Sequence, residues 1–395
     1  MKSDRLQDSE ANVTTKPTRL YYLDWLRVLA MFSIFFFHNA RFFDFDPWHV
    51  NNAETSLVPE IFVEFLNLWV LPLFFILAGA SVYYALKSRT AGGFAKERTL
   101  RILIPIIILG WFIIAPPQVY LERLTSGEFS GTIFQFYYPH YFDGLYGIGG
   151  NFALVPMHMW FLWLLFIYSL ILLPLFLHNK RTGSSLGSRL ATLFENPWTF
   201  VVPVLLLALS EVLLGSLGGL ISWGGGWNHL SYLLFFISGY LMFSNARIQE
   251  NIKRHAVIAL IAALVLQAFH YLLWFAIKPD LPDSKAVYLG IEIFSTLRSW
   301  LFIVTILGFG SRYLNFNNRF LRYANEAVLP FYILHQTIIL IIGFFVVQWS
   351  MGIAPKYFII STTSFVAIIA IYELLVRRTN ILRFLFGMVL KKKAG

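Results

Sequence analysis

Cysteine is absent from the 395 residues, and charged residues make up only 13% of them. Without cysteine the chain has no disulfide bond, no thiol nucleophile and no thiolate metal site. Soluble globular domains carry roughly a quarter of their residues as charges, whereas this chain is 57% hydrophobic with a mean hydropathy of +0.64. We therefore predict an all-α protein, folded as a polytopic transmembrane helical bundle.

Several sequence motifs of soluble enzymes are also missing. The chain has no GxxxxGK(S/T) phosphate loop, no HExxH zinc motif and no GxSxG nucleophile turn, and we find no internal repeat. The net charge of +10 does not indicate nucleic acid as a partner, because the position of the basic residues along the chain matters more than their number.

Ten apolar stretches are long enough to cross a bilayer as helices, for which about 17–25 residues suffice. They are approximately 20–43, 57–85, 102–118, 154–177, 199–219, 229–245, 256–277, 287–311, 327–349 and 357–376.

The basic residues alternate with these ten spans. Of the 31 Lys and Arg residues, 24 fall in the N-terminal tail or in segments after even-numbered spans, and only 4 fall after odd-numbered spans. Because basic segments stay in the cytoplasm, this bias predicts that both termini are cytoplasmic. The predicted organisation is a polar cytoplasmic tail (1–19), a ten-span transmembrane domain (20–376) and a basic cytoplasmic tail (377–395).

The first span contains four ionisable residues, which are costly inside a membrane and by default indicate a functional site. Asp24, Arg27, His38 and Arg41 follow one another at helical spacing, so they share one face of the helix. Arg27 and His38 are separated by about 16 Å along that face. The alternative interpretation is a tilted helix with snorkelling arginines and one hydrogen-bonded interior histidine.

The topology predicts two polar layers within the membrane. The outer layer is rich in histidine and carboxylate and suits proton transfer, whereas the inner layer is rich in arginine and suits phosphate groups. A metal site in the outer layer stays an alternative, although no local ligand spacing supports it. The outer layer includes His38, Arg41, Glu64, His158, Glu211, His229, His270 and Glu292, and the inner layer includes Arg98, Arg101, Glu326 and His335.

Aromatic residues are concentrated in the predicted outer segments 44–56, 119–153 and 219–228. Aromatic faces beside carboxylates and amides would suit a sugar ring, whose C–H face stacks while its hydroxyls form hydrogen bonds. The alternative is the interfacial aromatic belt that membrane proteins commonly carry.

Four blocks occur in an order that resembles the acyltransferase 3 family of membrane acyltransferases. Arg27 and His38 are similar to its Arg-x10-His motif. The other blocks are Leu73–Gly79 followed by Arg98–Pro105, His158–Leu162, and Phe331–His335. Within the family, segments 48–57 and 371–386 resemble the branch that succinylates periplasmic glucans. Ala78-Gly79-Ala80 and Glu326 depart from the family pattern.

The resemblance implies an enzyme of the cell (inner) membrane that moves an acetyl or succinyl group from cytoplasmic acyl-CoA to an extracytoplasmic glycan. His38 would be the general base or, in a variant mechanism, the acyl carrier. Arg27 and Asp24 would assist it, and no metal is implied. We expect acyl-CoA binding at Arg27, Arg98, Arg101 and His335, and acceptor binding or support at Arg41, Glu64, His158, Trp160 and Glu292.

Two other functions stay open from the sequence. A proton-coupled transporter of a glycan or an organic acid would also use intramembrane histidines and carboxylates, although no two-fold repeat supports it. A non-catalytic scaffold or sensor would leave the charged stripe of the first span without a purpose. The sequence does not specify the oligomeric state.

Overall fold

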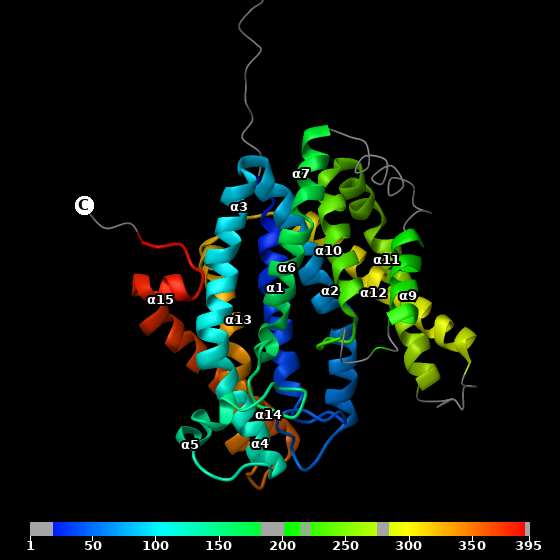
Figure 1. The fold of residues 1–395 in the computed structure, drawn as a ribbon. Helices are drawn as coiled ribbons and strands as arrows, with labels where there is room; N and C mark the ends of the chain where they lie inside the picture. The colour runs from blue at the N-terminus through cyan, green and yellow to red at the C-terminus, as the bar shows by residue number, and fades with distance from the viewer. Residues whose placement is uncertain (1–18, 183–200, 215–216, 218–221, 275–283, 392–395) are drawn as a thin grey trace, which may run out of the picture.

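The computed structural model describes residues 19–182, 201–214, 217, 222–274 and 284–391 (Figure 1). Within these ranges the only β-pairing consists of isolated bridges, so the predicted all-α class is confirmed. The main helices are α1 (Tyr21–Ala40), α2 (Leu57–Ser88), α3 (Ala91–Arg98), α4 (Ala115–Ser126), α5 (Ile133–Tyr137), α6 (Trp160–Ile171), α7 (Leu173–Thr182), α9 (Val201–Leu214), α10 (His229–Ser244), α11 (Ala246–Leu272), α12 (Lys285–Tyr313), α13 (Arg319–Val346), α14 (Ile353–Ile371) and α15 (Asn380–Leu385).

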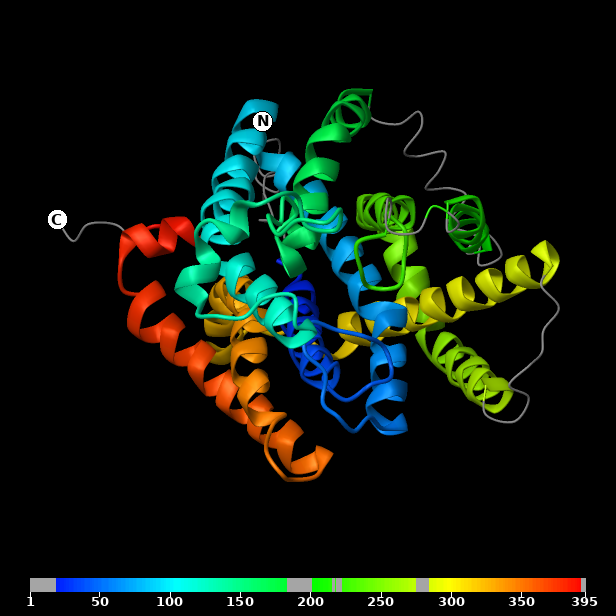
Figure 2. The ribbon, with the colours of Figure 1, turned by 60° about the horizontal axis from the view of Figure 1, so that its bottom comes forward.

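Helix α1 lies at the centre of the bundle and contacts α2, α12, α13 and α14. Helices α9 to α12 form one side of the molecule, and α13, α14 and α15 form the other (Figures 1 and 2). Helix α2 connects α1 to the side formed by α9 to α12, because it packs against α1 as well as α10 and α12. The charged stripe of α1 is therefore surrounded by protein on several sides.

Helices α2 and α10 cross at two glycines. A Cβ atom at Gly79 would lie 2.0 Å from the carbonyl oxygen of Phe236, and one at Gly239 would lie 2.1 Å from that of Ile76. Small residues allow such close backbone approach between membrane helices. Within the Ala78-Gly79-Ala80 segment of α2, Gly79 is therefore the residue that this crossing requires.

Every predicted span overlaps a helical stretch, but not every stretch has the length and apolarity of a complete membrane helix. Six do: Leu57–Ser88, Ala91–Ser126, Ala246–Leu272, Lys285–Tyr313, Arg319–Val346 and Ile353–Val376. Met157–Ile171 and Leu173–Lys180, bent by 46°, would together make a seventh. Helices α9 and α10 are shorter, and α1 carries Asp24, Arg27 and His38. The count of ten spans and the cytoplasmic termini stay predictions.

The segment 119–153 folds into a small lobe around α4 and α5. Phe136 and Tyr141 are fully buried in a separate apolar cluster, with Ala115, Val119, Ala153 and Met157 around them. Phe134 and Tyr138 are 85% and 77% exposed. Many of the aromatics in this segment thus pack against one another, and only a few present a free face to a ligand.

The C-terminal segment packs back onto the bundle as far as it is described. Arg383 donates to Glu326 of α13 at 2.8 Å, and Arg101 donates to the carbonyl oxygen of Gly387 at 2.8 Å. Glu326 therefore anchors the C-terminal segment, which gives this departure from the family pattern a structural role. Most of the predicted N-terminal tail lies outside the described residues.

Candidate active site

Three buried or half-buried histidines form a row across α1, α13 and the short turn Met157–Met159 that precedes α6. The ring centroids of His38 and His335 are 4.9 Å apart, and those of His335 and His158 are also 4.9 Å apart. Nε2 of His335 lies 3.1 Å from Nδ1 of His38. The predicted outer-layer histidines His38 and His158 are thus brought together, and His335 joins them.

Backbone carbonyls determine which nitrogen of each ring carries the proton. A carbonyl oxygen only accepts, so Nδ1 of His335 must donate to the oxygen of Tyr332 at 2.5 Å, which leaves its Nε2 as an acceptor. Nδ1 of His38 lies 3.0 Å from the oxygen of Ile34, so it also carries a proton. In the neutral ring, Nε2 of His38 then has a free lone pair.

His158 is held by two neutral partners. Its Nε2 donates to the carbonyl oxygen of Tyr332 at 3.1 Å, and its Nδ1 accepts from the side-chain amide of Gln118 at 3.2 Å. Gln118 in turn donates to Thr337 at 2.8 Å and accepts from Gln336 at 2.9 Å. Both nitrogens of His158 are therefore used in hydrogen bonds, which suits a supporting residue better than a base.

Trp48 covers the histidine row on the side of the loop after α1. Its ring stacks on His38 at 5.9 Å with 30° between the planes and also packs against His49. His49 pairs with Glu122 of α4, which accepts from the hydroxyl of Tyr146 at 2.8 Å. Arg41 binds Asp44 at 2.5 Å and the oxygen of Pro47 at 3.1 Å, so it fixes the loop that carries Trp48.

The other end of the α1 stripe is an arginine cluster. Asp24 accepts from Arg27 at 3.0 Å and from Arg19 at 2.6 Å, so two cations share one carboxylate. Arg27 also donates to the neutral side chains of Ser81 (3.0 Å) and Asn325 (3.4 Å). Among the described residues, the positive charge of this end is therefore only partly compensated.

Arg98 and Arg101 extend this cluster from α3 and the π-helical turn Thr99–Leu103. Arg98 lies over the ring of Phe94 and is close enough to Arg27, Arg89 and Arg101 for their charges to interact. Arg101 pairs with Glu97 at 3.1 Å and is 45% exposed. The structure thus gathers three of the four residues expected to bind acyl-CoA, with Arg98 near both Arg27 and Arg101.

Sequence comparison identifies the family. The model of the acyltransferase 3 family, described as an acyltransferase domain, matches residues 20–373. The chain belongs to the acyltransferase 3 family. It is 23% identical over 388 residues to glucans biosynthesis protein C of Escherichia coli strains K12, SMS-3-5 and O157:H7, covering 93% of this chain and 94% of those proteins. No solved structure matches the chain.

In this acyltransferase His335 does not lie beside Arg27, Arg98 and Arg101, with which it was predicted to bind acyl-CoA. The hydropathy of the sequence predicts that this span begins at residue 327, whereas α13 begins at Arg319. His335 is therefore 16 residues, or about 24 Å, into the helix, at the level of His38. Its contacts make it a partner of the histidine row, and no contact in the described chain joins it to an arginine.

Glu64 and Glu292, which were predicted to bind the acceptor or support the site, lie on the other side of the bundle. Glu64 lies 3.4 Å from Arg298 and 3.3 Å from His270. Glu292 lies near Glu211 and Tyr288. Among the described residues, no hydrogen bond or ion pair connects Glu64 or Glu292 to His38. Trp160 packs against Tyr232 and Gly224, also on the α10 side.

Several residues of the site were not predicted from the sequence: Trp48 as the cover, Gln118 and Thr337 as partners around His158, and Ser81 and Asn325 as partners of Arg27. Polar side chains within the predicted apolar spans provide a weak signal for three of them, namely Ser81, Gln118 and Thr337. Within the described residues, no group of three His, Asp or Glu side chains is placed to hold a metal ion.

Proposed function

We propose that this acyltransferase moves an acetyl or succinyl group from cytoplasmic acyl-CoA to a hydroxyl of an extracytoplasmic glycan, with His38 as the general base. The observation that supports this proposal best is the fixed protonation of His38. Its Nδ1 hydrogen faces the oxygen of Ile34 and the Nε2 of His335, so Nε2 is the nitrogen left to take a proton.

The proposed reaction begins when Nε2 of His38 removes the proton of the acceptor hydroxyl. The hydroxyl oxygen attacks the thioester carbon, and the tetrahedral intermediate collapses by breaking the carbon–sulfur bond. The CoA thiolate then takes the proton from His38, so the products are the glycan ester and free CoA. In the variant with an acyl-histidine, Nε2 attacks the thioester carbon first and the carbon–sulfur bond breaks to release the CoA thiolate. The acceptor hydroxyl then attacks the acyl-imidazole, the carbon–nitrogen bond breaks to restore His38, and the hydroxyl proton passes to the thiolate.

The arginine cluster supports the placement of the donor. CoA carries several phosphates, and guanidinium groups bind phosphate through paired hydrogen bonds. Within the part of the chain that the structure describes, the one carboxylate paired with Arg27 is Asp24, which it shares with Arg19, so an incoming phosphate would complete its charge balance. The pantetheine arm would then have to cover the roughly 16 Å between Arg27 and His38.

The acceptor is inferred from the relatives and from Trp48. Proteins named for glucan biosynthesis align with 93% of this chain. Trp48 stacks beside His38, where a sugar ring could pack as its hydroxyl approaches Nε2. In the topology predicted from the basic residues, this end would lie on the outer face of the inner membrane. Family membership disfavours the alternative of a proton-coupled transporter.

The test is transfer of labelled succinyl or acetyl groups from CoA to glucan by purified protein in liposomes. We expect His38→Gln to bind CoA normally and to lose transfer by about 100-fold or more, the usual contribution of a general base. His140→Gln, an exposed histidine in the outer lobe, is the matched control and should transfer normally. A His38→Gln protein with wild-type turnover would exclude both the general-base and the acyl-histidine mechanism.

A further inference from the structure

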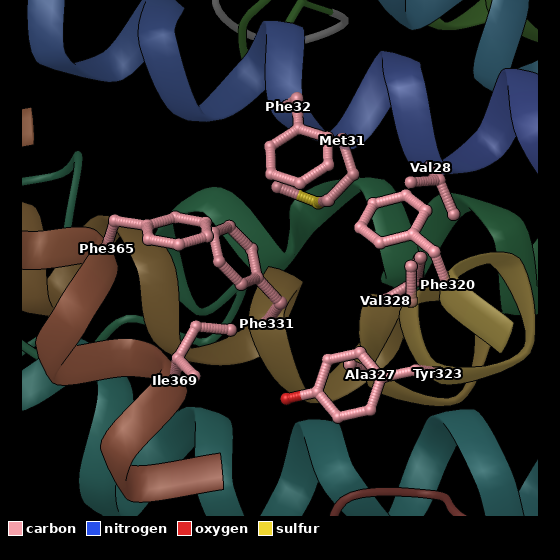
Figure 3. Close-up of a pocket in the computed structure, with 11 residues that line it drawn as sticks. Val28, Met31, Phe32, Phe320, Tyr323, Ala327, Val328, Phe331, Phe365 and Ile369 are labelled. Atoms are coloured by element: carbon pink, nitrogen blue, oxygen red, sulfur yellow. The ribbon is translucent and has the colours of Figure 1, made fainter. Parts of the chain in front are cut away.

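An apolar groove runs between α1, α13 and α14 (Figure 3). Helix α13 forms its floor, and α1 and α14 form its two walls. It encloses about 440 Å³, part of which is open to the surroundings. Its lining includes Val28, Met31, Ala324, Ala327, Phe331 and Ile369. We call this the α1–α13–α14 groove.

The groove is closed at one end and open at the other. Phe32, Phe331 and Phe365 pack against one another with centroid distances of 5.9 to 6.3 Å and close the end next to the histidine row (Figure 3). At the other end Phe320 is 51% exposed and stacks with Trp25 at 5.8 Å. The groove follows α13 from Phe320 to Phe331, a rise of about 16 Å.

The lining chemistry selects the kind of ligand. Among the side chains that line the groove, only that of Tyr323 carries a polar atom. A pantetheine arm has two amide groups, and each would be buried here without a hydrogen-bond partner, which is costly. A hydrocarbon chain loses no hydrogen bonds on entry and gains contact with the lining. The groove therefore fits an alkyl chain and does not fit the arm of CoA.

The open end is basic. Arg319 directly precedes Phe320, is exposed, and forms no ion pair in the described part of the chain. Arg377 lies 5.3 Å from the ring centre of Tyr323, and exposed Arg378 follows it. Glu326 pairs with both Arg377 and Arg383, and Glu373 pairs with Arg377, so these four arginines outnumber their two carboxylates by two. Such a cluster attracts an anionic headgroup at the membrane surface.

We propose that the α1–α13–α14 groove binds one acyl chain of an anionic phospholipid, with the headgroup at Arg319 and Arg377. The chain would fill the space between α1 and the α13–α14 pair up to the phenylalanine cluster. Because Phe331 is four residues from His335, an occupied groove would brace the helix that carries the partner of His38.

The experiment measures lipid binding by delipidated protein, using native mass spectrometry and thermal unfolding with dioleoyl phosphatidylglycerol or dioleoyl phosphatidylcholine. We expect one phosphatidylglycerol to bind more tightly than the others and to raise the melting temperature, and phosphatidylcholine to bind more weakly. Ala324→Phe fills the groove and should weaken this binding at least about tenfold, since excluding two methylenes is sufficient. Ala327→Phe is a second filling variant in case the first does not fold.

Matched controls separate the groove from general lipid contact. Ala268→Phe adds the same ring to an exposed position of α11 and should leave binding unchanged. Arg319→Gln should weaken phosphatidylglycerol binding about fivefold, whereas Arg254→Gln, an exposed arginine of α11, should not. Equal binding by wild type and both filling variants would overturn the proposal. Displacement of the lipid by succinyl-CoA would also overturn it, because the groove would then belong to the donor.

Discussion

Two arginines inside the helical bundle, Arg298 and Arg27, have opposite surroundings. Arg298 is 2% exposed and donates to Gln267 at 2.9 Å and to Glu64 at 3.4 Å. Glu64 in turn contacts His270 and accepts from Tyr271 at 3.1 Å. The side chain of Arg27 is 28% exposed and shares Asp24 with Arg19. Its other hydrogen bonds go to the neutral side chains of Ser81 and Asn325, and its charged neighbour Arg98 has the same sign.

The charge of Arg298 is compensated by a carboxylate inside the fold, whereas the charge of Arg27 can still bind an anionic ligand. A buried ion pair with hydrogen-bonded partners resists the loss of either member, because the remaining charge would stay buried and unpaired. A cation that shares one carboxylate with a second cation can still bind an anion. The same contrast holds for the histidines, since His270 lies beside a carboxylate and His38 lies beside a second neutral imidazole.

The largest effect is expected on stability at Arg298. Arg298→Leu leaves Glu64 without its main cation, which should lower the free energy of unfolding by about 3 kcal/mol. Transfer by the protein that remains folded should be normal. Chemical unfolding in micelles measures this, and Arg254→Leu, an exposed arginine, is the control. The double variant Arg298→Leu/Glu64→Leu should recover part of the loss. Wild-type stability of Arg298→Leu would remove the contrast with Arg27.

Arg27 should show the opposite pattern. Arg27→Leu should weaken CoA binding by roughly 10- to 150-fold, the range for one lost hydrogen bond to a charged group. Stability should change little, because Asp24 keeps Arg19 as a partner. Calorimetric titration with CoA measures the affinity. Arg19→Leu removes the other cation on the same carboxylate and should change affinity less than about fivefold. Equal donor affinity of Arg27→Leu and wild type would remove Arg27 from the donor site.

A smaller effect, on turnover, is expected from replacing His335, which orients the ring of His38 through a hydrogen bond. His335→Leu removes one neutral hydrogen bond and should lower turnover about 2- to 10-fold without changing the KM for the donor. His335→Gln should restore most of it, because its amide oxygen can accept from Nδ1 of His38. A structural defect alone would not be rescued in this way. His270→Leu is the matched control on the other side of the bundle, and its folded fraction should turn over normally. Equal turnover of His335→Leu and His335→Gln would show that His335 does not orient His38.

The smallest effect concerns the ion pair between Arg41 and Asp44 just after the C-terminal end of α1. Burial raises the pKa of Asp44 to about 7, although the adjacent Arg41 acts in the opposite direction. The folded protein then holds this proton more tightly than the unfolded chain, whose Asp pKa is about 4. The stability that Asp44 contributes is therefore complete below about pH 4 and is lost as pH rises toward 7.

Melting temperatures between pH 5 and pH 7 measure this dependence. Asp44→Asn should remove the fall over that range, whereas Asp46→Asn, whose side chain is 72% exposed, should keep it. The same slope in all three proteins would assign the dependence to another group.

The placement of residues on one helix could be predicted from the sequence, because it depends only on helical spacing. Arg27 and His38 lie on α1, and the inner arginines gather as expected. The partner of Glu64 could not be predicted in this way. The predicted depth in the membrane puts Glu64 at the level of His38. Glu64, however, lies on the side of α2 that faces α11 and α12, where it contacts His270 and Arg298. Hydropathy gives the depth of a residue and not the neighbour that it faces.

The sequence by itself determined the helical class, the family and the stripe of α1, since local apolarity, motif spacing and helical periodicity are properties of short segments. Only the tertiary structure decided the pairing of His335 with His38, the cover of Trp48, and the separation of Glu64 from the histidine row. These contacts join residues far apart in the chain, and they depend on where α13 begins and how it packs against α1. The free nitrogen of His38 is therefore a property of two helices together, because its protonation is fixed by Ile34 of its own helix and by His335 of the other.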